Sequence, residues 1–150
     1  MLRHAGTQRA ARMHKEAGLP RPHLQLVSLP TRVWSFIMSN PEQFEIVCDR
    51  IDAGNRPRAT MRVWMKIVTR IDWNTGAVPK AADLAAVTGL PDAEVRRALG
   101  DLVRHGGIVR VSRGSYIVNP EVVWRGGLIE RAQVADRVRP ALRMVDPVPA

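Results

Sequence analysis

The 150-residue sequence has one cysteine, Cys48, and lacks the features of disulfide-rich, zinc-cluster and membrane proteins. A single thiol cannot form an internal disulfide framework, and it cannot supply a cysteine-based zinc cluster. No apolar run reaches the roughly 18 to 20 residues that a helix needs to cross a bilayer. We therefore expect a cytoplasmic protein with no membrane association, in which Cys48 is a buried packing residue.

Residues that carry out catalysis are also sparse. His4, His14, His23 and His105 are scattered along the chain, and Tyr116 is the only tyrosine. A nuclease or nicking enzyme needs clustered histidines or carboxylates for a metal, with a nucleophile beside them. The sequence has no GxxxxGKS/T loop, which excludes a typical ATPase or helicase. We expect a binding protein that is not an enzyme and that uses no cofactor or metal.

Positive charge is abundant, because 23 Lys plus Arg against 14 Asp plus Glu give a formal net charge of +9. Only Lys15, Lys66 and Lys80 are lysines, so most of this charge is on arginine. The planar guanidinium group makes paired hydrogen bonds to phosphate and to guanine. This composition favours a polyanionic partner such as nucleic acid, the alternative being a basic surface without such a partner.

Residues 1–30 are predicted to form a flexible basic arm. They contain five basic residues against the single Glu16, and they show no periodic apolar stripe. The segment HLQLVSLP, residues 23–30, has the composition of a short strand. The arm either lies along DNA phosphates or makes no specific contact.

Two amphipathic helices are predicted next, in residues 40–53 and 59–72. The first begins with Asn40 as its N-cap and Pro41 at its first helical position. Its expected buried face consists of Phe44, Val47, Cys48 and Ile51. The expected buried face of the second consists of Met61, Trp64, Met65 and Val68.

Residues 81–105 contain two further helical patterns, separated by Thr88-Gly89-Leu90. Gly89 is suited to a left-handed cap at the end of the first helix, and Pro91 is suited to open the second. Their expected buried faces consist of Leu84, Ala85, Leu90, Val95, Ala98, Leu99 and Leu102. Two helices joined by a tight glycine turn predict a helix-turn-helix.

A β-hairpin is predicted directly after these helices, in the stretch that includes RVSRGSYIVNP. Gly106-Gly107 ends the preceding helix, and Gly114 supplies the positive φ of a tight turn that exposes Arg113. With a very short strand expected in WNTGAVP, the order of elements is typical of a winged helix-turn-helix. We expect a mainly α protein with a small β-hairpin, in which residues 31–127 form the winged-helix domain.

The candidate DNA-binding residues lie on the predicted second helix of the helix-turn-helix and on the hairpin. Because Val95, Ala98, Leu99 and Leu102 define the inward side of that helix, other positions face outward. The outward positions are Ala93, Arg97, Gly100 and Arg104, with Arg96 on the flank.

Each of these positions suits one kind of DNA contact. Ala93 can contact a thymine methyl group, Arg97 can bind guanine, and Gly100 permits close approach to the floor of the major groove. Arg104 and Arg110 are expected to hold phosphates, and Arg113 to reach the minor groove or the backbone.

A simpler interpretation exists for the charges on the second helix of the helix-turn-helix. Asp92 with Arg96 and Arg97 with Asp101 are opposite charges spaced i,i+4, as on many solvent-exposed helices. Such a pair contributes only about 0.2 to 0.5 kcal/mol, against roughly 1 to 3 kcal/mol for a good bidentate contact to a base. The acidic side chains at the helix start repel phosphate, which favours selective over indiscriminate binding.

The stretch SRGSYIVNPEVVWRGG, residues 112–127, resembles the wing of winged-helix plasmid replication initiators of the RepL type. In that family the second wing strand closes on Asn-Pro and is soon followed by an aromatic residue, a basic residue and glycine. Upstream, MRVWMKIVTRID and DLAAVTGLPDAEVRRALGDLVRHGGIVR are similar to its first core helix and helix-turn-helix. The resemblance covers about residues 31–127 and implies DNA-binding roles for Arg96, Arg97 and Arg113.

The resemblance implies a sequence-specific protein that binds repeats at a replication origin and recruits host replication proteins. The alternative is a transcriptional or copy-number regulator that uses the same surface, and a third reading is a winged-helix interaction module that does not bind DNA. A dimer would place two half-sites about one helical turn, roughly 34 to 36 Å, apart.

Residues 128–150 are expected to form a C-terminal helix and tail. Their narrow apolar stripe consists of Leu128, Ile129, Ala132 and Ala135, and Pro140 interrupts the pattern. This stripe either pairs with a second chain or packs on its own domain, and we favour pairing.

Overall fold

Five α-helices and four short strands form the part of the chain that the computed structural model describes, residues 36–142. In chain order these are β1 (Met38–Ser39), α2 (Pro41–Asp52), α3 (Pro57–Val68), α4 (Ala81–Thr88), α5 (Asp92–His105), β2 (Ile108–Ser112), β3 (Ser115–Val118), β4 (Val123–Trp124) and α6 (Leu128–Val138), followed by the short 3-10 helix η1 (Arg139–Ala141). The predicted basic arm, the strand expected in residues 23–30 and residues 143–150 lie outside the described residues.

The beginning of α2 follows from its first residues. The Asn40 side chain accepts a hydrogen bond from the backbone N–H of Gln43 at 3.2 Å, and Pro41 takes the first turn, where its missing N–H costs nothing. Val47 and Ile51 are buried, while Phe44 and Cys48 are half-buried and pack against the core. The predicted cap and helix are confirmed, although Cys48 is less buried than we expected.

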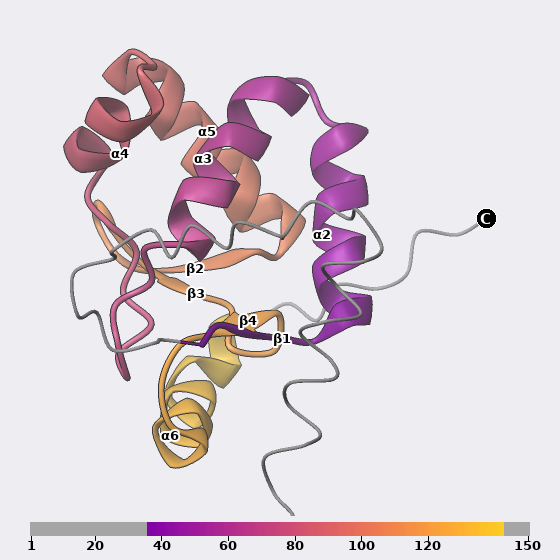
Figure 1. The fold of residues 1–150 in the computed structure, drawn as a ribbon, viewed down its shortest axis with the longest axis vertical. Coiled ribbons are helices and arrows are strands. Elements are labelled where there is room, and N and C mark those ends of the chain that lie inside the picture. The colour runs from indigo at the N-terminus through magenta and orange to yellow at the C-terminus, as the bar shows by residue number, and fades with distance from the viewer. Residues whose placement is uncertain (1–35, 143–150) are drawn as a thin grey trace, which may run out of the picture. The chain divides into compact units, whose positions relative to one another are not determined.

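Helix α3 lies at the centre of the helical layer and contacts α2, α4 and α5 (Figure 1). The Trp64 side chain is fully buried, as predicted, but Met65 is 46% exposed, so its place in the predicted core face was wrong. Val63 and Ile67 are buried instead. Because three helices pack around α3, its buried arc is wider than a single stripe and is turned away from Met65.

The turn between α4 and α5 and the end of α5 agree with the predicted glycine positions. Gly89 adopts φ 72° after α4, and Gly106 adopts φ 82° after α5, both in the left-handed region. The predicted inward residues of α5 are all buried, namely Val95, Ala98, Leu99 and Leu102. Two short helices joined by a glycine turn are therefore present as expected.

Strands β2 and β3 form the predicted antiparallel hairpin, with Ser112 opposite Ser115 and Arg113-Gly114 in the turn between them. Gly114 has φ 73°. The root of the hairpin is buried in the core through Ile108, Val109, Ile117 and Val118, whereas its closed end is exposed. A bridge from Ala77 to Ile117 supplies the very short strand expected in WNTGAVP.

The chain after the hairpin folds back under the core. The Asn119 side chain donates to the Gly106 carbonyl oxygen at 2.9 Å and accepts from the Glu121 backbone N–H at 3.0 Å. Trp124 is buried on β4, which pairs with β1. Asn119-Pro120 therefore ends β3 and connects the hairpin to the end of α5.

Helix α6 packs on its own domain through its later turns, where Val134, Ala135 and Val138 are buried. Of the predicted apolar stripe only Ala135 is buried, and Leu128 and Ile129 are 68% and 72% exposed. The pairing of this stripe with a second chain stays a prediction. Figure 1 shows helices α2 to α5 on one side of the hairpin and α6 on the other.

This arrangement is mainly helical with a small two-stranded hairpin, and it is compatible with a winged helix-turn-helix. None of the described helices is long and apolar enough to span a bilayer.

Candidate nucleic-acid interface

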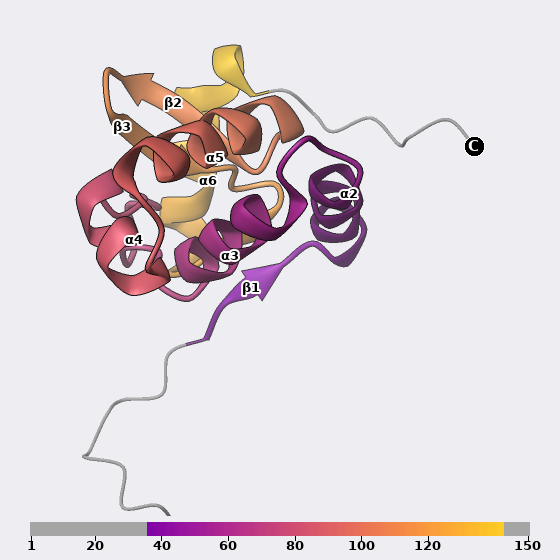
Figure 2. The ribbon, with the colours of Figure 1, turned by 90° about the horizontal axis from the view of Figure 1, so that it is seen from above.

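Helix α5 and the β2–β3 hairpin lie against each other and form one edge of the fold (Figure 2). After Gly106-Gly107 reverses the chain, β2 runs back along α5, so the closed end of the hairpin lies toward the first turns of α5. A turn of two residues keeps this end narrow. We call this surface the α5–hairpin edge and define it by Ala93, Arg96, Arg97, Gly100, Arg104, Arg110 and Arg113.

All but one of the predicted site residues are exposed on this edge. The exposed residues are Ala93, Arg96, Arg97, Arg104, Arg110 and Arg113. Gly100 is half-buried, yet a Cβ atom added there would meet no atom within 4 Å. The outward face of α5 thus combines arginines with small residues, which lets another surface approach the helix axis closely.

Four arginines of this edge have no intramolecular partner in the described part of the chain. Arg96, Arg97, Arg110 and Arg113 take part in none of the hydrogen bonds or ion pairs between described residues. The two i,i+4 pairs expected on α5 are therefore not formed. Each of these guanidinium groups can offer all of its N–H donors to a ligand without first breaking a described contact.

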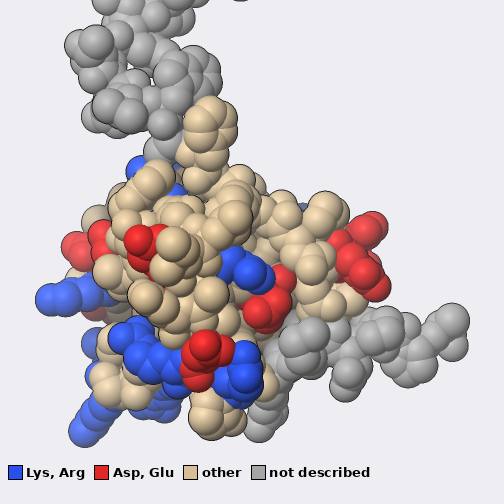
Figure 3. Space-filling view, turned by 90° about the horizontal axis from the view of Figure 1, so that it is seen from below, with Lys and Arg blue, Asp and Glu red and all other residues tan. Residues whose placement is uncertain are grey.

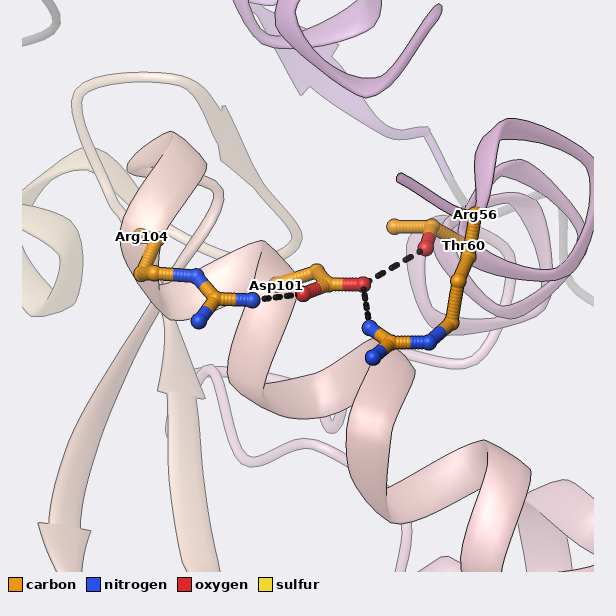
Figure 4. A network of polar contacts seen from close by, with 4 residues as sticks. All are labelled: Arg56, Thr60, Asp101 and Arg104. Atoms are coloured by element: carbon orange, nitrogen blue, oxygen red, sulfur yellow. Dashed lines mark hydrogen bonds and ion pairs between the residues drawn. The ribbon is translucent and has the colours of Figure 1, made fainter. Parts of the chain in front are cut away.

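Asp101, expected on the solvent side of α5, is buried, with 4% of its side chain exposed. One carboxylate oxygen accepts from Arg56 at 2.7 Å and from the Thr60 hydroxyl at 3.4 Å, and the other accepts from Arg104 (Figure 4). Burial by itself would raise the pKa of Asp101, but the hydrogen bonds from the two arginines hold it below its ordinary value. Asp101 therefore stays ionised and joins α5 to the start of α3.

Sequence reasoning missed this network because two of its members are far from Asp101 in the chain. Arg56 and Thr60 precede it by about forty residues, and helical spacing gives no information on contacts between helices. One signal was present: Asp101 lies between the buried residues Ala98 and Leu102, at the border of the inward face. An acid at such a border needs a cationic partner, and Arg56 is available in the breaker GNRPR.

A hollow of about 420 Å³ lies between the end of α5, β2 and η1. Arg104 and Arg110 both line it, although they come from different elements. Arg104 is 66% exposed even while it is paired with Asp101. The structure thus places the two predicted phosphate contacts beside one concave surface.

Charge is distributed differently on the side of the fold seen from below (Figure 3). Basic side chains gather along the lower edge of this face with acidic ones among them, acidic side chains lie at its right edge, and a basic and an acidic group lie near its centre. In the α6 region, Arg131 binds the Pro120 carbonyl oxygen at 2.7 Å and Glu121 at 3.2 Å. Arg139 pairs with Asp136 at 2.6 Å. These arginines hold the chain together locally.

The described side chains contain no cluster of potential metal ligands. Among residues 36–142, no group of three or more histidine, cysteine, aspartate or glutamate side chains could hold a metal ion.

No protein-family model matches the sequence, and no curated protein or solved structure is significantly similar to it.

Proposed function

We propose that this protein binds double-stranded DNA with a winged helix-turn-helix, in which α5 enters the major groove and the β2–β3 hairpin is the wing. The observation that carries this proposal is the set of four exposed arginines without a described partner on two adjacent elements. The net charge of +9 gives long-range attraction to a polyanion. An α-helix fits the width of the major groove of B-form DNA.

The contacts follow from the order of residues along α5. Arg97 binds the O6 and N7 atoms of guanine, Ala93 contacts a thymine methyl group, and Gly100 lets the helix approach the bases. Arg113, at the closed end of the hairpin, reaches the adjacent minor groove or its phosphates, and Arg96 holds the flanking backbone. Base contacts of this kind select a sequence, while the remaining arginines supply affinity.

We further propose a role in plasmid replication initiation, in which the protein binds origin repeats and recruits host replication proteins. This role rests on the resemblance of residues 112–127 to the RepL-type wing. A repressor of transcription or copy number would use the same α5–hairpin edge. The bound DNA separates these roles: an array of direct repeats beside the gene supports replication, and a palindrome that overlaps a promoter supports repression.

A homodimer is part of the same proposal. Leu128 and Ile129 are exposed at the start of α6, and Met38 lines a groove together with Leu128. Two copies that meet through these side chains would bury them and present two α5 helices to successive half-sites. The mass of the full chain in solution tests this, because the Ile129→Glu variant should be monomeric if the parent is a dimer.

Duplex binding is tested by fluorescence anisotropy with a labelled duplex of random sequence over a range of salt concentrations. We expect a steep loss of affinity with salt, and weaker binding by Arg97→Ala and Arg113→Ala. The control is Arg137→Ala, because Arg137 is exposed on α6 and has no described partner. A parent protein that shows no salt-dependent binding would instead support the interaction-module reading.

A further inference from the structure

The hollow between α5, β2 and η1 contains two cationic side chains and no acidic one. Its lining consists of Val103, Arg104, Gly106, Ile108, Val109, Arg110, Asn119, Pro140 and Ala141. Arg104 enters it from the last turn of α5, and Arg110 from the middle of β2. A concave surface with two guanidinium groups and no carboxylate in its lining favours an anion.

The charge of Arg104 is not cancelled by its contact with Asp101. The same carboxylate also binds Arg56, so the three groups together carry one net positive charge. Arg110 adds a second and has no described partner. The hollow is therefore lined by the unpaired charge of Arg110 and by Arg104, which belongs to a group with a net positive charge.

Asp101 fixes the position of Arg104. The carboxylate is itself held by Arg56 and by the Thr60 hydroxyl, and its burial leaves it little freedom (Figure 4). One Arg104 nitrogen donates to Asp101, so most of the N–H donors of this guanidinium group remain available. A side chain held in place before binding loses less rotamer entropy when the ligand arrives.

The place of Arg104 on α5 indicates which anion this is. Arg104 follows Arg97 by seven residues, two turns along the same face and about 10 Å further along the helix axis. With Arg97 at the bases, that distance reaches the sugar-phosphate backbone at the border of a groove about 12 Å wide. We propose that Arg104 and Arg110 together bind one phosphodiester group of the duplex backbone in this hollow, with Asp101 as the positioning residue for Arg104.

This inference rests on the proposed duplex binding, and the salt dependence of that binding tests it separately. The logarithm of affinity falls with the logarithm of salt concentration by about 0.9 for each phosphate neutralised. If the two arginines share one phosphate, the arginine that remains in Arg104→Gln or in Arg110→Gln still neutralises it, so each single variant should bind more weakly with little change in slope. The double variant should lose about 0.9 from the slope. The probe is the same duplex of random sequence.

The control is Arg137→Gln. Arg137 is exposed on α6, has no described partner and does not line the hollow. Its removal should leave the slope unchanged. Arg104→Lys combined with Arg110→Gln keeps one charge at the hollow and should restore most of the slope lost in the double Gln variant. Thermal unfolding of each variant verifies that the fold persists.

Three results would overturn the inference. A double variant that loses about 1.8 from the slope would show that the two arginines bind separate phosphates. An unchanged slope in the double variant would remove the site, and a loss of the same size in Arg137→Gln would show that the slope follows net charge alone. In these cases the parent still binds DNA, and the proposed function stands. A parent that binds no duplex overturns both proposals.

Discussion

At the α5–hairpin edge, Arg96, Arg97, Arg110 and Arg113 have no described partner, whereas Arg131 and Arg139 near α6 are bound to acids or to a carbonyl oxygen. The two regions contain the same side chain in two chemical situations. A paired arginine must give up a contact before it binds a ligand, and an unpaired one gains a contact without that loss. The number of arginines in a sequence therefore overstates the surface that is available to bind DNA.

Asp101 combines the two situations. It forms ion pairs with Arg56 and Arg104, yet the Arg104 side chain stays exposed on the surface. Near α6, Asp136 pairs with Arg139 in the open, with 69% of the acid side chain exposed. The same two residue types at the same spacing thus pair through a buried acid in one region and through an exposed acid in the other.

The largest effect we predict comes from breaking the buried pair. Asp101→Asn should lower the free energy of unfolding by about 3 kcal/mol, because it leaves the partly buried Arg56 without its counter-charge. The matched change Asp136→Asn should cost less than about 1 kcal/mol, as is typical of exposed ion pairs. Urea unfolding measures both. Equal losses in the two variants would contradict the contrast between the regions.

The ion pairs of Asp101 also predict that the free energy of unfolding depends on pH in the acid range. The pKa of Asp101 is lowered from 3.8 in the folded protein, so the carboxylate binds a proton less readily there than in the unfolded chain. Its contribution to stability is complete above the unfolded pKa and is lost as the pH falls through the folded pKa. As the pH is lowered, the free energies of unfolding of the parent and of Asp101→Asn should therefore converge.

The second largest effect concerns the surface of α5. Gly100→Glu should weaken duplex binding by at least about tenfold, or 1.4 kcal/mol, because it adds a negative side chain at the face of α5 that we propose enters the major groove. The fold should tolerate the change, since a Cβ atom at Gly100 meets no neighbour within 4 Å.

Two controls separate charge from position in this experiment. Gln133→Glu makes the same change in charge on an exposed position of α6 outside the apolar stripe and should leave affinity close to that of the parent. Gly100→Ala should bind normally and raise stability by about 0.5 to 1 kcal/mol, as expected when glycine is replaced inside a helix. If Gln133→Glu weakened binding as much as Gly100→Glu, the two regions would not differ in function.

The smallest effect we predict comes from His105, the last residue of α5. Burial lowers its pKa below 6.5, and the nearby Arg104 and Arg50 lower it further, against the opposing charge of Asp101. Because the unfolded chain binds this proton more readily, the free energy of unfolding should fall as the pH drops below about 6.5. In His105→Gln the decline over this range should be shallower, and an identical pH profile would contradict the assignment.

Much of the fold could be predicted because local chemistry fixes it. Asn40, Gly89, Gly106 and Gly114 act through their own backbone or their nearest neighbours, and each is found where the sequence placed it. The inward face of α5 was also correct, because a single apolar stripe at helical spacing leaves little choice of side.

The errors arose where the outcome depended on elements far apart in the chain. Met65 satisfies helical spacing, but the packing of α2, α4 and α5 decides which side of α3 is buried. The partner of Asp101 was misassigned for the same reason, since Arg97 is near it in sequence and Arg56 is near it in space.

The most direct test of the account is to map the DNA-contacting surface by NMR, following backbone amide and arginine side-chain signals during addition of a short duplex. The account predicts that signals of Arg96, Arg97, Arg113 and Gly114 shift with the duplex, while those of α6 stay in place. Shifts confined to α6, or an unperturbed α5–hairpin edge in a protein that binds the duplex, would contradict it.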